Sequence, residues 1–219
     1  MKLLDIKNEI HPKLYEKLES KITELRPSQE KSIKAGLFEN KNLLVCTPTA
    51  SGKTLIAELA SLNSIYNQIG KAVYIVPLKA LASEKYKEFK ERYPDIKVAL
   101  SVGDTDSNDS YLEKYDLIVT TSEKLDSLIR HHTPWLRFVS VVIIDEIHLL
   151  NDASRGPTLE VIITVLKKVL RKMQLIGLSA TIGNPKELAE WLDATLVEDS
   201  WRPVKLKKGV YMDGEIEFY

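Results

Sequence analysis

Short, almost entirely apolar runs recur along the chain and alternate with longer stretches of mixed apolar and polar residues. The apolar runs cover residues 42–46, 72–76, 97–101, 116–120, 139–144 and 174–179. Strands that are apolar on both sides are typical of a parallel sheet whose two faces are covered by helices. The pattern therefore predicts six buried strands.

The stretches between these runs have helical spacing. Two series of apolar residues recur at intervals of three or four: Leu55, Leu59, Leu62, Tyr66 and Ile69, and then Leu159, Ile162, Leu166 and Val169. This spacing places each series on one face of a helix. Strands alternating with helices predict an α/β fold with a doubly wound, mainly parallel sheet and helices on both faces.

The alternation of strands and helices ends near Trp201. The tail that follows, WRPVKLKKGVYMDGEIEFY, contains Pro203 and a basic cluster, and then alternates apolar and polar residues as a further strand does. We expect residues 1–199 to form one domain and residues 200–219 to lead out of it.

Composition narrows the class of protein. Basic and acidic residues number 31 each, so any polyanion site has to be a local groove. The longest nearly unbroken apolar run, residues 138–144, is too short to span a membrane, and the charged N-terminus does not resemble a signal peptide. We expect a cytoplasmic protein with no membrane partner. Cys46 is the single cysteine and lies in an apolar run, which predicts a buried, unreactive thiol.

Residues 47–54, TPTASGKT, follow the first apolar run and open a helical stretch. They match the phosphate-loop pattern G-x-x-x-x-G-K-S/T except that Thr47 replaces the first glycine. In this context Gly52 lets the backbone approach phosphates, Lys53 reaches the β and γ phosphates, and the Thr54 hydroxyl ligates Mg²⁺. An accidental loop-to-helix turn is the alternative. The predicted site for nucleotide phosphates and Mg²⁺ comprises Thr47, Pro48, Thr49, Ala50, Ser51, Gly52, Lys53 and Thr54.

The run VVIIDEIH, residues 141–148, places two carboxylates at the end of a buried strand. The carboxyl ends of parallel strands share one sheet edge, so Asp145 is expected beside the phosphate loop. Asp145 can hold Mg²⁺ through water, and Glu146 can orient or deprotonate the water that attacks the γ phosphate. A solvated Asp-Glu pair is the alternative. Because kinases must exclude water, Glu146 favours hydrolysis, with Lys53, Asp145 and Glu146 as catalytic residues.

These motifs resemble those of superfamily 2 DExH-box helicases, with DEIH at residues 145–148 as the signature box. Along nearly its whole length the chain looks most like archaeal Holliday-junction-migration helicases, which are related to the helicase part of DNA polymerase theta. In that family the phosphate loop commonly begins with Ala or Thr, so Thr47 fits. The resemblance implies a RecA-like ATP-binding lobe of a 3′–5′ DNA helicase that unwinds forked or recombination intermediates in DNA repair.

The resemblance also implies an adenine-reading motif in LRPSQ, residues 25–29. Gln29 would offer an amide donor and acceptor to adenine, and Pro27 would stiffen the turn. A glutamine at the surface of a loop is the alternative.

LSATIGNP, residues 178–185, resembles the motif that links ATP hydrolysis to strand movement. The hydroxyls of Ser179 and Thr181 would bond to the 145–148 box, with His148 as the bridge. The alternative for His148 is a histidine satisfied within the core. RGPTLE, residues 155–160, also resembles the family, but no role for Arg155 follows from it.

Three segments resemble those that contact single-stranded nucleic acid. Two are strand-to-helix junctions, where helix N–H groups, hydroxyls or an ammonium bind phosphate, and the third, SVGDTDS at 101–107, is a glycine turn with at most backbone contact. An exposed lysine on a capped helix and ordinary N-capping explain the two junctions as well. The implied residues are Pro77, Lys79, Ala80, Thr121, Ser122 and Gly103.

Helicases of this kind close two lobes around ATP, and nothing after residue 185 offers the arginine-rich motifs of the second lobe. We expect the first lobe alone, nearly inactive by itself, with residues 200–219 leading into a second lobe. Expected partners of the longer protein are single-stranded or forked DNA and replication or recombination proteins. The alternatives are an RNA helicase lobe, a nucleotide-dependent switch, and a small-molecule kinase, for which no lid or acceptor pocket is evident.

Overall fold

The computed structural model describes residues 1–103, 109–170, 172–212 and 214–218, and it confirms the α/β class. Its main sheet has seven strands in the order β3-β4-β2-β5-β6-β1-β7, and every described pairing in it is parallel. The strands are β1 Leu43–Cys46, β2 Lys71–Val76, β3 Val98–Ser101, β4 Leu117–Thr121, β5 Val139–Ile144, β6 Gln174–Ser179 and β7 Thr195–Glu198.

All six predicted strands are present, with bounds within one residue of the apolar runs. The sequence missed β7, which pairs with β1 at one edge of the sheet. Val197 is the buried residue of its four, so β7 lacks the apolar run that marks a central strand.

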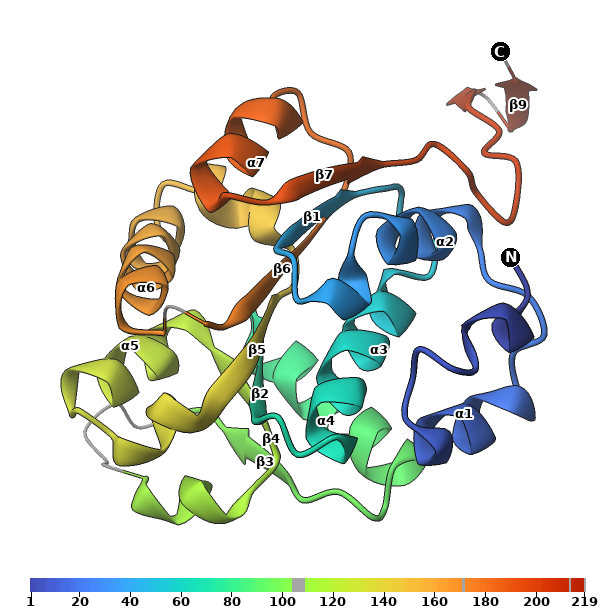
Figure 1. Cartoon of the computed structure of the whole chain (residues 1–219). Coiled ribbons are helices and arrows are strands. Elements are labelled where there is room, and N and C mark those ends of the chain that lie inside the picture. The colour runs from blue at the N-terminus through green and yellow to red at the C-terminus, as the bar shows by residue number, and fades with distance from the viewer. Residues whose placement is uncertain (104–108, 171, 213, 219) are drawn as a thin grey trace.

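Helices cover both faces of the sheet (Figure 1). On one face lie α1 Pro12–Glu19, α2 Pro27–Lys34, α3 Lys53–Tyr66 and α4 Lys79–Arg92. On the other lie α5 Ser122–Arg130, α6 Gly156–Val169 and α7 Pro185–Leu192. Single turns of 3-10 helix form η1 Leu3–Ile6, η2 Leu37–Glu39, η3 Ser110–Lys114, η4 Pro134–Phe138 and η5 Ile147–Asn151.

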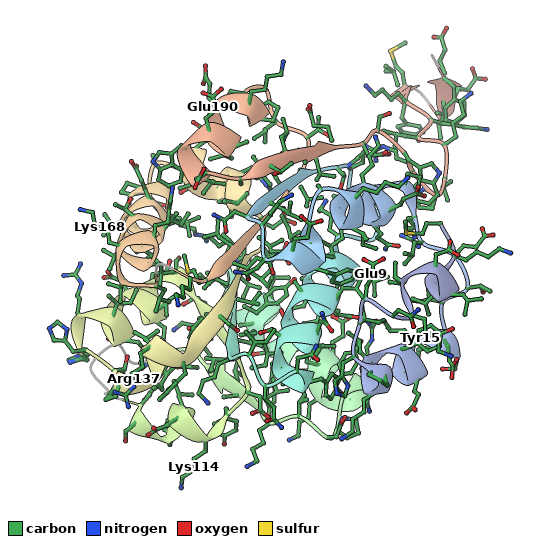
Figure 2. All side chains as sticks on the ribbon, viewed as in Figure 1. Glu9, Tyr15, Lys114, Arg137, Lys168 and Glu190 are labelled. Carbon is green, nitrogen blue, oxygen red and sulfur yellow. The ribbon has the colours of Figure 1, made fainter. Side chains whose placement is uncertain are left out.

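Each face of the sheet has its own apolar core. Successive residues of a strand point to opposite faces, so Val45 packs with Ile56 of α3 while Leu44 belongs to the core that contains Ile162 of α6. Side chains fill the space between the sheet and the helices on both sides (Figure 2). This double coverage is the reason that the strands read as continuous apolar runs.

The predicted helix that included Ile69 is shorter than expected. Helix α3 ends at Tyr66, Gln68 takes a left-handed conformation with φ 56°, and Ile69 is 69% exposed beyond it. In α6, Leu159, Ile162 and Leu166 are buried as predicted, but the terminal Val169 is exposed. Apolar spacing continued past both buried faces, so it overestimated where each face ends.

The tail forms a hairpin rather than one further strand. Strands β8 Gly209–Met212 and β9 Glu215–Phe218 pair antiparallel, and their residues are exposed. They lie beyond the end of β7, apart from the main sheet (Figure 1). Among the described helices, none combines the length and the apolar character needed to cross a bilayer.

Candidate functional site

The phosphate loop connects β1 to α3, as the sequence predicts. Gly52 is the N-cap of α3 with φ 92°, and a Cβ at this position would lie 2.5 Å from Gln29 Nε2. A side chain here would be strained by the left-handed backbone and would displace the neighbouring glutamine. Ala50 also has a positive φ of 62°. The loop thus exposes its backbone at the start of a helix, where phosphate binds most readily.

Thr47, which replaces the first glycine of the pattern, is fully buried. Its Oγ1 lies 2.7 Å from Ser51 Oγ, and its N–H donates to the Ser179 carbonyl at 3.2 Å. The hydroxyl therefore joins the two ends of the loop, a bond that glycine could not supply.

Lys53 is the first residue of α3 and turns back into the loop. Its Nζ donates to the carbonyls of Thr47 at 2.8 Å and Pro48 at 3.2 Å. Burial lowers the pKa of Lys53, and the nearby carboxylates of Glu146 and Asp145 oppose that shift. An anionic phosphate in the loop would favour the charged ammonium further.

The predicted catalytic residues meet at one cavity of about 460 Å³. Lys53 and Thr54 reach it from the loop, and Asp145 and Glu146 from the end of β5. The remaining lining comes from the start of α2, the loop, the end of β2, α4 and the tail: Arg26, Thr49, Ala50, Gly52, Val76, Leu81, Glu84, Lys85 and Pro203. Parallel strands thus bring together residues that are about ninety positions apart in the sequence.

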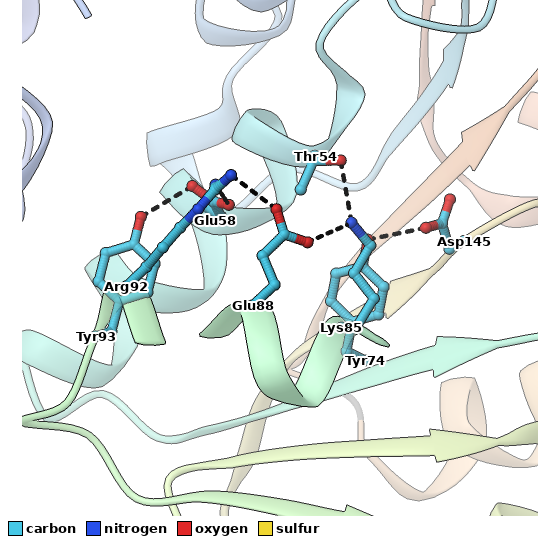
Figure 3. Close-up of polar contacts among 8 residues, drawn as sticks. All are labelled: Thr54, Glu58, Tyr74, Lys85, Glu88, Arg92, Tyr93 and Asp145. Carbon is cyan, nitrogen blue, oxygen red and sulfur yellow. Dashed lines mark hydrogen bonds and ion pairs between the residues drawn. The ribbon is translucent and has the colours of Figure 1, made fainter. Parts of the chain in front are cut away.

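Asp145 is held by two donors. Tyr74 Oη donates to its Oδ2 at 3.0 Å (Figure 3), and the N–H of Glu146 donates to its Oδ1 at 3.0 Å. Burial and the adjacent Asp145 raise the pKa of Tyr74 well above its usual value, so the phenol stays a donor. Glu146 has a left-handed backbone with φ 54°, and His148 Nδ1 lies 3.3 Å from its Oε2.

The donor set suits a magnesium ion held together with a nucleotide. Thr54 offers a hydroxyl and Asp145 a carboxylate on the wall of one cavity. Across the described residues, no group of three His, Cys, Asp or Glu side chains could hold a metal alone. Mg²⁺ usually takes one or two protein oxygens and completes its shell with phosphate and water, so these residues fit it.

Gln29 lies at the start of α2 rather than in a loop, with Pro27 as the first helical residue. The side chain is 4% exposed. Its Oε1 accepts from the Arg26 N–H at 2.8 Å, and its Nε2 donates to the Gly52 carbonyl at 2.9 Å. Both polar atoms are thus bonded to backbone, and adenine reading by Gln29 stays a prediction that requires these bonds to be exchanged.

The three segments predicted to contact nucleic acid lie on neighbouring strands. Val76 pairs with Thr121 and Ser101 pairs with Thr120, so the junctions after β2 and β4 and the turn after β3 share one sheet edge. At the first junction Lys79 and Ala80 are exposed in the opening turn of α4, directly after Pro77. Strand β2 also borders β5, which places this group beside the acids of the cavity.

At the second junction the capping interpretation is supported. Thr121 and Ser122 are buried, and Thr121 Oγ1 accepts the Lys124 N–H at 3.5 Å as the N-cap of α5. Gly103 has φ 104°, in agreement with a turn, while residues 104–107 of the SVGDTDS segment lie outside the described residues.

The predicted coupling residues are close in the fold but not bonded to one another. Ser179 ends β6, which lies between β5 and β1, and its Oγ is buried without a hydrogen bond among the described residues. Thr181 is exposed, and His148 contacts Glu146. Arg155 lines a small hollow with Pro77, Asp145 and other residues between the acids and the predicted nucleic-acid edge. The coupling bond stays a prediction.

Sequence reasoning missed three residues of the site: Arg26, Tyr74 and Lys85. Arg26 Nη1 donates to the Ala50 carbonyl at 2.6 Å and so braces the phosphate loop. The sequence did contain a feature that could have identified Tyr74, because a tyrosine inside a buried strand needs a hydrogen-bond partner for its hydroxyl. The spacing of α4 could likewise have identified Lys85, since it shares the inward face of that helix with the buried Ala82 and Phe89.

Known proteins match this arrangement. Residues 26–188 match the sequence profile of the DEAD/DEAH box helicases. The chain belongs to that family. Membership implies that the chain binds a nucleotide, ATP.

Several curated relatives are named ATP-dependent DNA helicase Hel308. The chain is 56% identical to that of Methanococcus vannielii over 205 residues, which is 90% of this chain and 27% of the relative. It is 57% identical to that of Pyrococcus abyssi over 194 residues, 88% of this chain and 27% of the relative. The chain therefore spans about a quarter of the length of these relatives.

Solved helicase structures share the fold. The DUF1998 helicase MrfA superposes with a TM-score of 0.76 at 32% identity, covering 87% of this chain and 33% of MrfA. MrfA bound to DNA superposes with a TM-score of 0.77 at 31% identity, covering 88% and 30%. The seven-stranded parallel sheet flanked by helices is the RecA-like helicase fold.

Proposed function

We propose that this chain is the ATP-binding first motor lobe of an ATP-dependent 3′–5′ DNA helicase that acts on forked or recombination intermediates in DNA repair. The observation that carries the proposal is that one edge of the sheet holds two neighbouring groups of residues, one predicted to bind nucleotide and one predicted to contact nucleic acid. Strands β1 and β5 bring Lys53, Thr54, Asp145 and Glu146 to a single cavity. The neighbouring strands β2, β4 and β3 end in the segments predicted to contact nucleic acid.

In the proposed reaction Lys53 leaves the loop carbonyls to bind the β and γ phosphates. Mg²⁺ supplies charge stabilisation when bound, with Thr54 and Asp145 as the residues that would hold it. Glu146 orients the attacking water and accepts its proton. Tyr74 supports this chemistry because its hydrogen bond fixes the Asp145 carboxylate that would hold the metal.

Two features favour strand contact by the same lobe. Helix α4 presents its N-terminus and the exposed Lys79 at the edge beside the cavity, which suits a phosphate backbone. DNA as the substrate is supported by the names of the relatives and by the DNA-bound neighbour. Ser179, Thr181 and His148 are proposed to relay the γ phosphate to this edge.

We further propose that residues 1–199 form the lobe and residues 200–219 lead into a second one. The proposal is supported by the share of the relatives that the chain covers, 27% in two cases. A second lobe would supply an arginine finger, which contributes roughly 10³ to 10⁵ in rate. The lobe alone is therefore expected to bind nucleotide weakly and to hydrolyse it very slowly.

The test is the ATPase rate of a protein that carries this sequence followed by its second lobe, measured by phosphate release with and without single-stranded DNA. We expect stimulation by DNA, loss of the rate in Lys53→Ala with the fold retained, and a far lower rate for residues 1–219 alone. A rate indifferent to DNA would favour a nucleotide switch, and stimulation by RNA alone would favour an RNA helicase. Normal turnover of Lys53→Ala would remove Lys53 from its role.

A further inference from the structure

Lys85 is a second ammonium of the phosphate cavity that the nucleotide motifs do not include. It lies in the middle of α4, and its side chain is 18% exposed. Its Nζ is 3.4 Å from Thr54 Oγ1 and 2.8 Å from Glu88 Oε2 (Figure 3). The hydroxyl that it approaches is the one proposed to ligate Mg²⁺, so Lys85 and the metal compete for the same oxygen.

Lys85 is held there by a chain of charges between α3 and α4. Glu88 accepts from Lys85 with one oxygen and pairs with Arg92 Nη2 at 2.8 Å through the other. Arg92 Nη1 then pairs with the buried Glu58 of α3 at 2.6 Å (Figure 3). Thr54 and Glu58 are one turn apart on α3, so these charged contacts connect α3 and α4 at both ends of the series. They give Lys85 a defined resting position.

We propose that Lys85 is a built-in counter-cation of this cavity, a further phosphate-binding residue that acts when the nucleotide carries no metal. With metal-free nucleotide its ammonium turns from Thr54 and Glu88 to a phosphate oxygen. When Mg²⁺ takes the Thr54 hydroxyl, repulsion between the two cations drives Lys85 back onto Glu88. This inference rests on the proposed nucleotide site and adds a residue to it.

The consequence is a division of labour between Lys85 and the metal. Metal-free nucleotide is bound by Lys53 and Lys85, whereas magnesium nucleotide is bound by Lys53 and Mg²⁺. Glu88 sets the balance, since it competes with phosphate for the same ammonium.

The experiment titrates residues 1–219 with a fluorescent N-methylanthraniloyl ADP, once with excess Mg²⁺ and once with EDTA. Lys85→Met is expected to weaken binding in EDTA about tenfold, the scale of one charge-assisted hydrogen bond, and by less than about twofold in Mg²⁺. Glu88→Gln is expected to strengthen binding in EDTA, because it releases Lys85. Opposite signs from two partners of one ion pair would not arise from a loss of packing.

Lys87→Met is the matched control, because Lys87 is exposed on the same helix and the substitution removes the same charge. It should leave both titrations unchanged. Equal affinities of Lys85→Met and Lys87→Met in EDTA, with binding that still depends on Lys53, would overturn the role of Lys85 alone. Absence of nucleotide binding by the unaltered chain in both buffers would overturn the proposed nucleotide site and this inference with it.

Discussion

At the scale of a single residue, Gly52 connects the two parts of the predicted nucleotide site. Its carbonyl accepts a hydrogen bond from Gln29 Nε2, in the segment predicted to read adenine, and it is the N-cap of the helix predicted to bind phosphate. A side chain at this position would displace Gln29, since only 2.5 Å separates the two. The glycine is therefore needed for the contact with Gln29 as much as for the approach of phosphate.

Cys46 gives a prediction at the same scale. It ends β1 directly before the phosphate loop and is 4% exposed. Burial, with a contribution from Glu198, raises the pKa of its thiol to about 11. Thiolate is the reactive form, so the folded chain is expected to react with a disulfide reagent at pH 8 at least ~100-fold more slowly than the unfolded chain.

The release of thionitrobenzoate with and without guanidinium measures this difference. Cys46→Ser should give no signal in either condition, which assigns the reaction to the single thiol. Fast reaction of the native chain would show that the end of β1 opens to solvent.

At the scale of secondary-structure elements, an ion pair joins helices α3 and α4. Glu58 of α3 is 3% exposed, pairs with Arg92 Nη1 at 2.6 Å and accepts from Tyr93 Oη at 2.9 Å. Burial raises the pKa of Glu58, and Arg92 opposes this shift. The packing of α3 against α4 thus involves a buried carboxylate that would destabilise the folded chain without the Arg92 guanidinium.

Arg92→Ala is expected to lower the free energy of unfolding by about 2 kcal/mol at pH 7.5, less than for a fully buried pair because the guanidinium is 43% exposed. A carboxyl group whose pKa is higher in the folded than in the unfolded state does not lower the free energy of unfolding at a pH below its unfolded-state pKa. It lowers that free energy most at a pH above its folded-state pKa. The substitution raises the pKa of Glu58 further, so its penalty should shrink as the pH falls toward 5.

Urea unfolding at pH 7.5 and pH 5 measures this dependence. The double variant Glu58→Gln, Arg92→Ala should recover most of the loss, because a neutral amide still accepts from Tyr93. An equal loss at both pH values, unrelieved by Glu58→Gln, would mean that Arg92 acts through Glu88 or through packing instead.

The order of strands organises the whole molecule. Strands β5, β6 and β1 are contiguous and lead to the residues predicted for the nucleotide site and for coupling, while β3, β4 and β2 are contiguous and end in the predicted nucleic-acid segments. The two groups meet where β2 borders β5, and there α4 links Lys79 at its start to Lys85 in the cavity.

The domain boundary gives a prediction at this scale. A chain ending at residue 199 keeps β7 and loses mainly the contact of Arg26 with the Trp201 ring, 5.6 Å away, so its Tm should fall by less than about 5 °C. A chain ending at residue 193 loses β7, including the buried Val197, and its Tm should fall by more than about 10 °C.

Thermal unfolding followed by circular dichroism compares the two truncations. A large loss in the 199-residue chain would move the boundary of the lobe into the tail.

The sequence by itself determined the class of fold, six of the seven strands of the main sheet, and the phosphate-loop and acidic residues predicted for the site. These features are written locally, because a strand buried on both faces must be apolar throughout and a phosphate loop needs glycine, lysine and threonine within a few residues. The same local rules failed for β7, where Val197 is the buried residue of the four, and for Ile69, where the apolar spacing outlasts the helix.

Only the tertiary structure decided which of these residues meet. It placed Gln29 in a helix against Gly52, gave Asp145 its bond from Tyr74, and set Lys85 beside Thr54. Each contact joins residues more than twenty positions apart, and each depends on the order of strands and on which face of a helix turns inward. Pairwise spacing along a chain carries no record of that order, because strand neighbours are chosen by the packing of the complete sheet.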